Sequence, residues 1–230
     1  MTTRLSTTQI RTLALFVVLP ALIAASQLIP HDFFFPEMGA LFTLSVYDVA
    51  LAMVGLSLNS AQVPDIRFSL SLIALFLCAL LPTVQFTEPL LRFLERLAID
   101  GNLYALPPSA VVLTGLGLWA PDRWRRAACL TVAPLLGFTL GLFIGLEDLA
   151  IFSFICGAIT SALWCLIAPS LLARHFIPAR PLRIAARILG SWLLVIGLIV
   201  FLTALLPARE QVPTDGTNSP LSDGTSVQQE

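Results

Sequence analysis

The chain has 230 residues, of which 57% are hydrophobic and only 12% are charged, and its mean hydropathy is +0.88. Soluble domains carry about a quarter charged residues, so this composition excludes an ordinary soluble protein and indicates a polytopic membrane protein. The net charge is −1 and all 13 basic residues are arginines, which leaves no broad basic surface for nucleic acid.

Apolar segments of near-spanning length follow one another along the whole chain. A helix needs about 20 mostly apolar residues to cross the hydrocarbon core of a bilayer. Seven segments approach or reach this length: 10–30, 39–59, 67–86, 103–120, 127–146, 149–172 and 188–206. The fourth is the weakest, because Pro107 and Pro108 lie in its first turns. The pattern predicts an all-α polytopic transmembrane bundle of six or seven helices.

The two ends of the chain differ from the bundle, which we place at residues 30–206. Residues 1–29 are either a leader or the first transmembrane helix, because Arg4 and Arg11 precede an apolar stretch that ends in "LPALIAASQ", similar to a signal-peptidase site. Cleavage near Ser26 leaves six helices, whereas retention gives seven. Residues 207–230 are rich in Gly, Pro, Ser and Thr, which predicts a disordered polar tail.

Two connecting stretches are expected at the membrane surface. "TEPLLRFLERLAID" (87–100) places leucines on one side and charges on the other, which predicts an amphipathic helix on the outer surface with Thr87 as its N-cap. "RHFIPARPLRIAARI" (174–188) is interpreted as a basic inner linker that determines topology and suits anionic headgroups.

The arginines orient the predicted bundle, because cytoplasmic loops carry an excess of basic residues. With the amino terminus inside, only Arg92, Arg96 and Arg209 lie outside. The inner group is Arg4, Arg11, Arg67, Arg123, Arg125, Arg126, Arg174, Arg180, Arg183 and Arg187. We therefore expect a multi-pass protein of a bacterial inner (plasma) membrane, with its C-terminus on the outer, periplasmic side.

Small residues recur at helical spacing in four of the segments. The stripes are Ser45, Asp48, Ala52, Gly55 and Asn59 in the second segment; Gly137, Gly141 and Gly145 in the fifth; Ser153, Gly157, Ser161 and Cys165 in the sixth; and Gly190, Gly197 and Ala204 in the last. Helices in lipid associate through such faces. We expect the interior of the bundle to lie between these four helices.

Asp48 is the one acid on these stripes within an apolar run, and no basic residue lies within ten positions of it. A buried ionised carboxylate is costly, so we expect Asp48 to face other helices, either protonated or hydrogen-bonded. One interpretation is a proton relay or a cation ligand. The other is a protonated acid bonded to a neighbouring hydroxyl or carbonyl group.

Three further residues are candidate metal ligands near the outer surface. Glu147 and Asp148 lie where the fifth segment meets the sixth, and such a pair is either a solvated helix cap or a cation entrance. His31 lies in the short loop "PHDFFFPEMG", where it either recruits a metal or is solvated.

Sequence signatures of enzymes are missing. The chain has no phosphate-binding loop, GxSxG elbow, HExxH motif or dinucleotide fingerprint. Its two histidines are too few for a haem pair plus a catalytic base. We expect no enzymatic activity, and the sequence identifies no cofactor.

The order of motifs resembles the HupE/UreJ family, small nickel permeases associated with hydrogenase and urease maturation. The similar stretches are "YDVALAMVGL" (47–56), "GNLYALPPSAVVLTGLGLW" (101–119), "FIGLED" (143–148), "GAITSALW" (157–164) and "RILGSWLLVIGL" (187–198). The resemblance implies a cleaved leader, about six helices and a metal site that includes Asp48.

The chain departs from that family at its histidines. Phe42 and Val49 stand where the first motif has them, and the second motif has Ile144, Leu146 and Asp148 instead. Nickel prefers imidazole, whereas carboxylates select harder cations or protons. We therefore expect a permease-like protein for a small cation or protons in the lipid bilayer. The alternative is a non-transporting membrane subunit that anchors or assembles a partner complex, and a homo-oligomer stays open.

Overall fold

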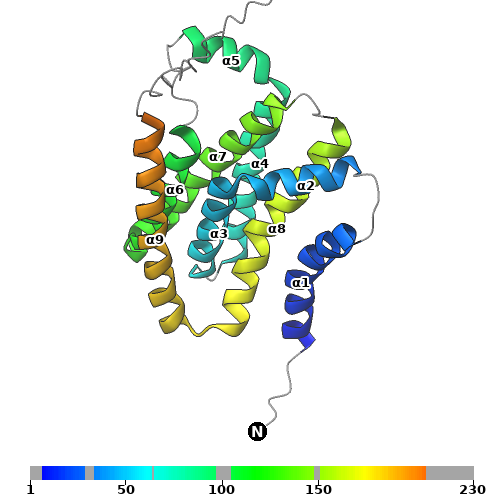
Figure 1. The fold of residues 1–230 in the computed structure, drawn as a ribbon. Helices are drawn as coiled ribbons and strands as arrows, with labels where there is room; N and C mark the ends of the chain where they lie inside the picture. The colour runs from blue at the N-terminus through cyan, green and yellow to red at the C-terminus, as the bar shows by residue number, and fades with distance from the viewer. Residues whose placement is uncertain (1–6, 29–33, 64, 97–104, 148–150, 206–230) are drawn as a thin grey trace, which may run out of the picture.

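The computed structural model describes residues 7–28, 34–63, 65–96, 105–147 and 151–205 (Figure 1). Within these ranges the regular elements are all helical, so the predicted all-α class is confirmed. The helices are α1 (Thr7–Leu28), α2 (Phe35–Ser45), α3 (Tyr47–Ala61), α4 (Ile66–Gln85), α5 (Thr87–Arg96), α6 (Leu106–Trp119), α7 (Asp122–Leu146), α8 (Phe152–Phe176) and α9 (Ala179–Leu205).

Five of these helices are long and apolar enough to cross a membrane, namely α1, α4, α7, α8 and α9. The broken pair of α2 and α3 makes a sixth span if the two count as one. The predicted fourth span is only the 14 residues of α6, which is shorter than a bilayer requires. Pro107 and Pro108 occupy its first turn, where proline is tolerated because those N–H groups have no helical partner.

The predicted continuous span 39–59 is broken at Val46, where α2 and α3 meet at 79°. Val46 has φ −78° and ψ 68°, outside the helical region. Ser45 is exposed at the end of α2, and its hydroxyl donates to the carbonyl of Phe42 at 2.7 Å, a local bond that competes with the helical ladder. The predicted stripe of small residues therefore starts on α3, where Ala52, Gly55 and Asn59 are buried. Ser45, on α2, is not part of this buried face.

The helix α3 lies in the middle of the bundle and contacts α2, α6, α7, α8 and α9 (Figure 1). Its side chains Val49, Met53 and Leu56 are fully buried there. Around α3 the other helices pack mainly in pairs: α4 with α7, α6 with α9, and α2 with α8. The expected interior between the four striped helices is therefore correct only in part. The stripes of α7 and α9 pack on α4 and α6, which lie outside that set, whereas the stripe of α8 packs on α2, the first half of the predicted second segment.

The glycines let helix backbones touch within these pairs. A Cβ atom at Gly137 of α7 would overlap the carbonyl oxygen of Phe76 in α4, and one at Gly157 of α8 would overlap that of Pro36 in α2. In α9, a Cβ atom at Gly190 would lie 2.9 Å from the Cβ atom of Leu118 in α6. Glycine is required at such contacts because any side chain would force the backbones apart.

Two surface predictions are corrected in detail. Thr87 is the first residue of α5 rather than its N-cap, because its hydroxyl donates backwards to the carbonyl of Thr83 at 2.7 Å. The stretch 174–188 is not a linker, since α8 continues to Phe176 and α9 starts at Ala179. Only residues 177–178 separate two long helices, so the basic side chains lie on helix ends.

One end of the bundle, which we call the arginine end, combines the ends of α3 and α8 with the starts of α4, α7 and α9. In Figure 1 it lies at the bottom, where α8 passes into α9. The described arginines on the helix turns nearest this end are Arg11, Arg67, Arg123, Arg125, Arg126, Arg174, Arg180, Arg183 and Arg187. They match the described members of the group predicted to lie on one side of the membrane.

Candidate functional site

Asp48 lies in the first turn of α3, directly after the break at Val46. Its side chain is half-buried, and no hydrogen bond or ion pair joins its carboxylate to the rest of the described chain. The structure thus shows neither the hydroxyl partner nor the carbonyl partner that one interpretation of Asp48 requires. A helix break also leaves the last carbonyls of the first helix and the first N–H groups of the second without helical partners.

The other predicted metal ligands are not gathered around Asp48 in the described residues. Glu147 is exposed and ends α7, where its backbone N–H donates to the carbonyl of Ile144 at 3.3 Å. Asp148 and His31 lie outside the described residues. Within the described ranges, no three His, Cys, Asp or Glu side chains are close enough to hold a metal ion. A metal role for these residues stays a prediction.

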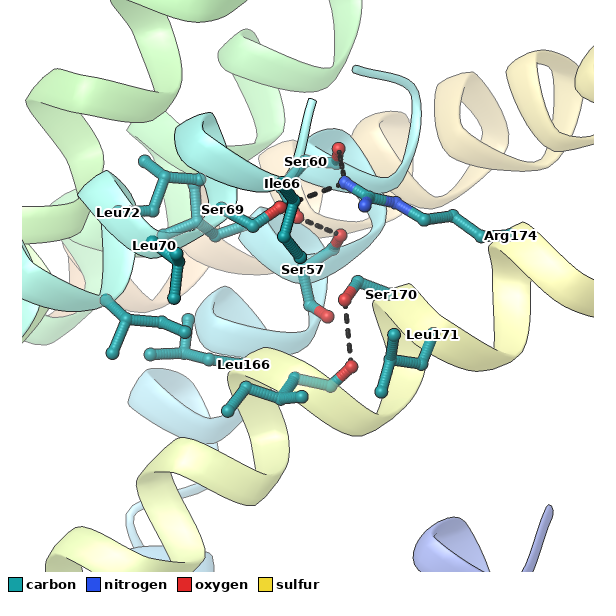
Figure 2. A pocket seen from close by; sticks show the side chains of 13 residues that line it. Ser57, Ser60, Ile66, Ser69, Leu70, Leu72, Leu166, Ser170, Leu171 and Arg174 are labelled. Atoms are coloured by element: carbon teal, nitrogen blue, oxygen red, sulfur yellow. Dashed lines mark hydrogen bonds between the residues drawn. The ribbon is translucent and has the colours of Figure 1, made fainter. Parts of the chain in front are cut away.

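Two cavities meet at the arginine end, and they share Ile66 and Arg174. The serine cavity has a volume of about 250 Å³ and lies between α3, α4 and α8 (Figure 2). Its wall is apolar except for Arg174 and four serines, Ser57, Ser60, Ser69 and Ser170. The arginine cavity has a volume of about 570 Å³ and is lined by Ala61, Gln62, Ile66, Arg125, Arg174, His175, Ile177, Ala179, Leu182 and Arg183.

Arg174 joins the two cavities and ties three helices together. From α8 its guanidinium donates to the carbonyls of Ser60 at 2.8 Å and Val63 at 2.9 Å, and to the hydroxyl of Ser69 at 3.0 Å. Figure 2 shows the side chain reaching across from α8 towards Ser60 and Ser69. The two carbonyl groups lie at the carboxyl end of α3, so Arg174 caps α3 while it contacts the first turn of α4.

Buried polar atoms without a hydrogen-bond partner converge on these cavities. In the part of the chain that the structure describes, such atoms are Ser57 Oγ, Asn59 Oδ1, Gln62 Nε2, Arg125 Nε, Ser161 Oγ and Arg174 Nε. All but Asn59 and Ser161 belong to residues that line one of the two cavities. Native proteins leave few buried polar groups unpaired, and such groups often belong to sites that bind something.

Ser161 shows what an unpaired group costs outside the serine and arginine cavities. Its side chain is fully buried in α8 without a partner, so we expect Ser161→Ala to raise the free energy of unfolding by up to about 1 kcal/mol. The nearby hydroxyl of Thr43 in α2 donates to the Ala158 carbonyl of α8 at 3.2 Å, so Thr43→Val should lower it by about 1 kcal/mol. Thermal unfolding of the two variants in detergent checks both, and shifts of the same sign would contradict the assignment.

The sequence pattern does not predict the arginine cavity, although it contains part of the signal. The basic run 174–188 predicts an inner surface segment that determines topology and suits anionic headgroups. Arg125 is likewise predicted on the inner side of the membrane, yet only 7% of its surface is exposed and it pairs with Asp122. The polar run at the end of α3, from Ser57 to Gln62, was the remaining clue.

No known protein family, no curated protein and no solved structure matches the chain. The polar features that carry a functional argument are the broken span at Asp48 and the two cavities at the arginine end. All of them lie within a bundle that is otherwise apolar.

Proposed function

We propose that the chain is a permease-like multi-pass membrane protein that moves a small cation or protons, with Asp48 as the acid on the path. The observation that carries this proposal is the broken span, in which a carboxylate without a partner among the described residues follows directly on a 79° bend. Interrupted helices recur at the substrate and ion sites of transporters, because the break frees backbone groups inside the membrane.

The environment of Asp48 supports a cation or proton rather than an anion. The carboxyl end of α2 carries the partial negative charge of its helix dipole, and Asp48 follows it by three residues, in the first turn of α3. An acid inside a membrane segment is costly to keep unless it has a use. A carboxylate in the first turn of α3 also stabilises that helix by about 0.3–1 kcal/mol through the helix dipole. Because removing it can therefore lower stability as well as transport, the test below requires a correctly folded variant.

The resemblance to the HupE/UreJ family enters this proposal with an altered site. Of the two positions where that family has histidines in its first motif, Phe42 packs its ring 5.5 Å from that of Phe154, and Val49 is fully buried. Both residues fill the apolar core, so neither position offers a metal ligand. A carboxylate site without imidazole suits protons or hard cations better than nickel.

The proposed orientation follows the arginines. The arginine end lies in the cytoplasm of a bacterial cell, and the break at Asp48 lies in the half of an inner-membrane protein that faces outwards. Glu147, Asp148 and His31 then belong to the outer mouth of the path, and the polar tail extends on the outer side. Reversed accessibility of cysteines introduced at the two ends would contradict this orientation.

The test compares Asp48→Asn with Glu88→Gln in liposomes. Glu88 is exposed and its only described ion pair is with Arg92 of α5, so its variant removes the same charge from the surface. Proton flux is followed with a trapped pH-sensitive dye, and influx of Mg²⁺, Mn²⁺ and Ni²⁺ is followed with metal-sensitive dyes. We expect Asp48→Asn to reduce the flux at least about tenfold, which corresponds to an activation free energy of transport higher by about 1.4 kcal/mol or more. Glu88→Gln should leave the flux unchanged.

A correctly folded Asp48→Asn protein that keeps full flux of protons and of every metal would refute the transport proposal. The alternative, a non-transporting membrane subunit, is favoured by the apolar packing at Phe42 and Val49, which removes imidazole ligands. A stoichiometric partner that co-purifies with the chain, together with no flux in liposomes, would support that alternative.

A further inference from the structure

We propose that the arginine cavity is a binding site for a phosphate group, carried either by an anionic lipid headgroup or by free phosphate. This inference is independent of the proposed transport through Asp48, because the site lies at the other end of α3. It rests on the charge of the cavity wall, on buried donors without partners and on the shape of the space.

The wall of the arginine cavity is strongly basic. It carries the guanidinium groups of Arg125, Arg174 and Arg183 together with the imidazole of His175, and none of the described residues that line it is acidic. Asp122, the ion-pair partner of Arg125, is largely exposed and lies outside the lining. The cavity thus keeps a surplus of positive charge, which a phosphate group neutralises.

Three buried nitrogen atoms of the lining residues have no hydrogen-bond partner: Nε of Arg125, Nε of Arg174 and Nε2 of Gln62. The side chain of Arg125 is more than nine-tenths buried, so water does not compensate its free donor. The three nitrogen atoms come from α7, α8 and the end of α3, which the fold brings to one cavity. A phosphate group has enough acceptor oxygens to pair with several of these donors at once.

His175 adds a further contact. Its Nδ1 lies 2.8 Å from the carbonyl oxygen of Leu171. A carbonyl can only accept, so Nδ1 carries the hydrogen and Nε2 is the ring nitrogen left to contact a ligand. When the ring is protonated, Nε2 donates to an anion.

The space suits a phosphate that carries an attached group. At about 570 Å³ the arginine cavity is larger than one phosphate needs, and at Ile66 and Arg174 it adjoins the mainly apolar serine cavity. A lipid would place its headgroup phosphate among the arginines and part of an acyl chain against Leu70, Leu166 and Leu171 (Figure 2). Free phosphate would use the basic part alone.

The test measures binding to the full chain in neutral detergent in two arms. One arm titrates inorganic phosphate against chloride at equal ionic strength, and the other titrates phosphatidylglycerol against phosphatidylcholine in mixed micelles. Binding in both arms assigns the site to phosphate itself, and binding of phosphatidylglycerol alone assigns it to a lipid headgroup. No binding above chloride and phosphatidylcholine would overturn the proposal.

Matched arginines on α9 test the position of the site. Arg183 lines the cavity, whereas Arg180, which is also exposed on the same helix, does not. We expect Arg183→Gln to weaken binding about tenfold and Arg180→Gln to weaken it less than about twofold. Equal losses in the two variants would show a diffuse charge effect and would overturn the proposal.

A third variant separates binding from folding. Gln62→Leu removes a buried unpaired donor, so without ligand the variant should unfold at the same or a higher temperature than the unmodified chain. It should nevertheless weaken binding about threefold or more, because the amide no longer contacts the phosphate. Unchanged affinity in a folded Gln62→Leu protein would count against the site as described.

Discussion

Gly137→Ala is expected to lower the free energy of unfolding by about 3 kcal/mol, the upper range for an overpacked core. For a chain of this size the unfolding temperature should fall by about 6–12 °C, as measured by tryptophan fluorescence in detergent. The reason is that α7 lies against the backbone of α4 at this residue. An added Cβ atom would overlap the carbonyl oxygen of Phe76 and lie 3.2 Å from the backbone nitrogen of Leu80.

Backbone atoms cannot rotate away as a side chain does, so relief requires α4 and α7 to separate along their length. The matched control is Gly117→Ala in α6. A Cβ atom there would lie 3.5 Å from both the Ala128 Cβ and the Asn59 Nδ2 atoms, which is an ordinary contact. That variant should change stability by less than about 1 kcal/mol, because alanine also favours the helix. Equal effects of the two substitutions would contradict a backbone contact at Gly137.

The glycine spacing predicted which faces are buried but not what covers them. Gly137, Gly141 and Gly145 recur at four-residue steps, so one helix face was certain to approach a neighbour closely. Gly137 and Gly141 pack on α4, which presents Phe76 and Leu80 and has no glycine, whereas Gly145 packs on Thr87 of α5. The sequence of α4 therefore contains no sign of the contact. A close approach of two helices needs small residues on one side only, and partner choice is therefore not a local property.

The break at Val46 was not predictable from local sequence either. The stretch contains no proline at the break, and the apolar run continues through it. The bend follows from tertiary contacts: Gly39 of α2 fits against the Phe154 carbonyl of α8, and Gly157 of α8 fits against Pro36 of α2. Docking on α8 therefore outweighs the tendency of residues 35–61 to form one straight helix.

The arginine cavity required the assembled fold. Its basic residues come from α7, α8 and α9, and the arginine run of α7 is typical of a solvated loop in sequence. The expected division of arginines between the two ends depends on many residues together. Errors in single predicted segments, such as the span 39–59, therefore do not change it. The burial of Arg125 depends on which helices surround it, and no pattern within residues 121–130 encodes that.

Arg174→Met is expected to cost about 3 kcal/mol of unfolding free energy, with a fall of about 6–12 °C in unfolding temperature. Methionine keeps much of the length of the side chain but removes the donors to Ser60, Val63 and Ser69. The carbonyls of Ser60 and Val63 then lose a charged partner at the end of α3. Hydrogen bonds to a charged group contribute about 1.5–3 kcal/mol each, so this loss exceeds that of a surface ion pair.

Arg174→Lys separates charge from geometry at the same position. Nη2 of Arg174 donates all three of these bonds. Lysine keeps the positive charge and also carries its donors on one nitrogen atom, but its shorter side chain holds that atom nearer to α8, so it reaches the groups on α3 and α4 less well. We expect it to lose about half as much stability as methionine, and the exposed Arg180→Met to lose less than about 0.5 kcal/mol. The unfolding series is run without phosphate and in neutral detergent, which keeps ligand binding out of the comparison. A lysine variant as stable as the unmodified chain would mean that charge alone holds α3, α4 and α8 together. A methionine variant as stable as both would mean that Arg174 does not contribute to joining these helices.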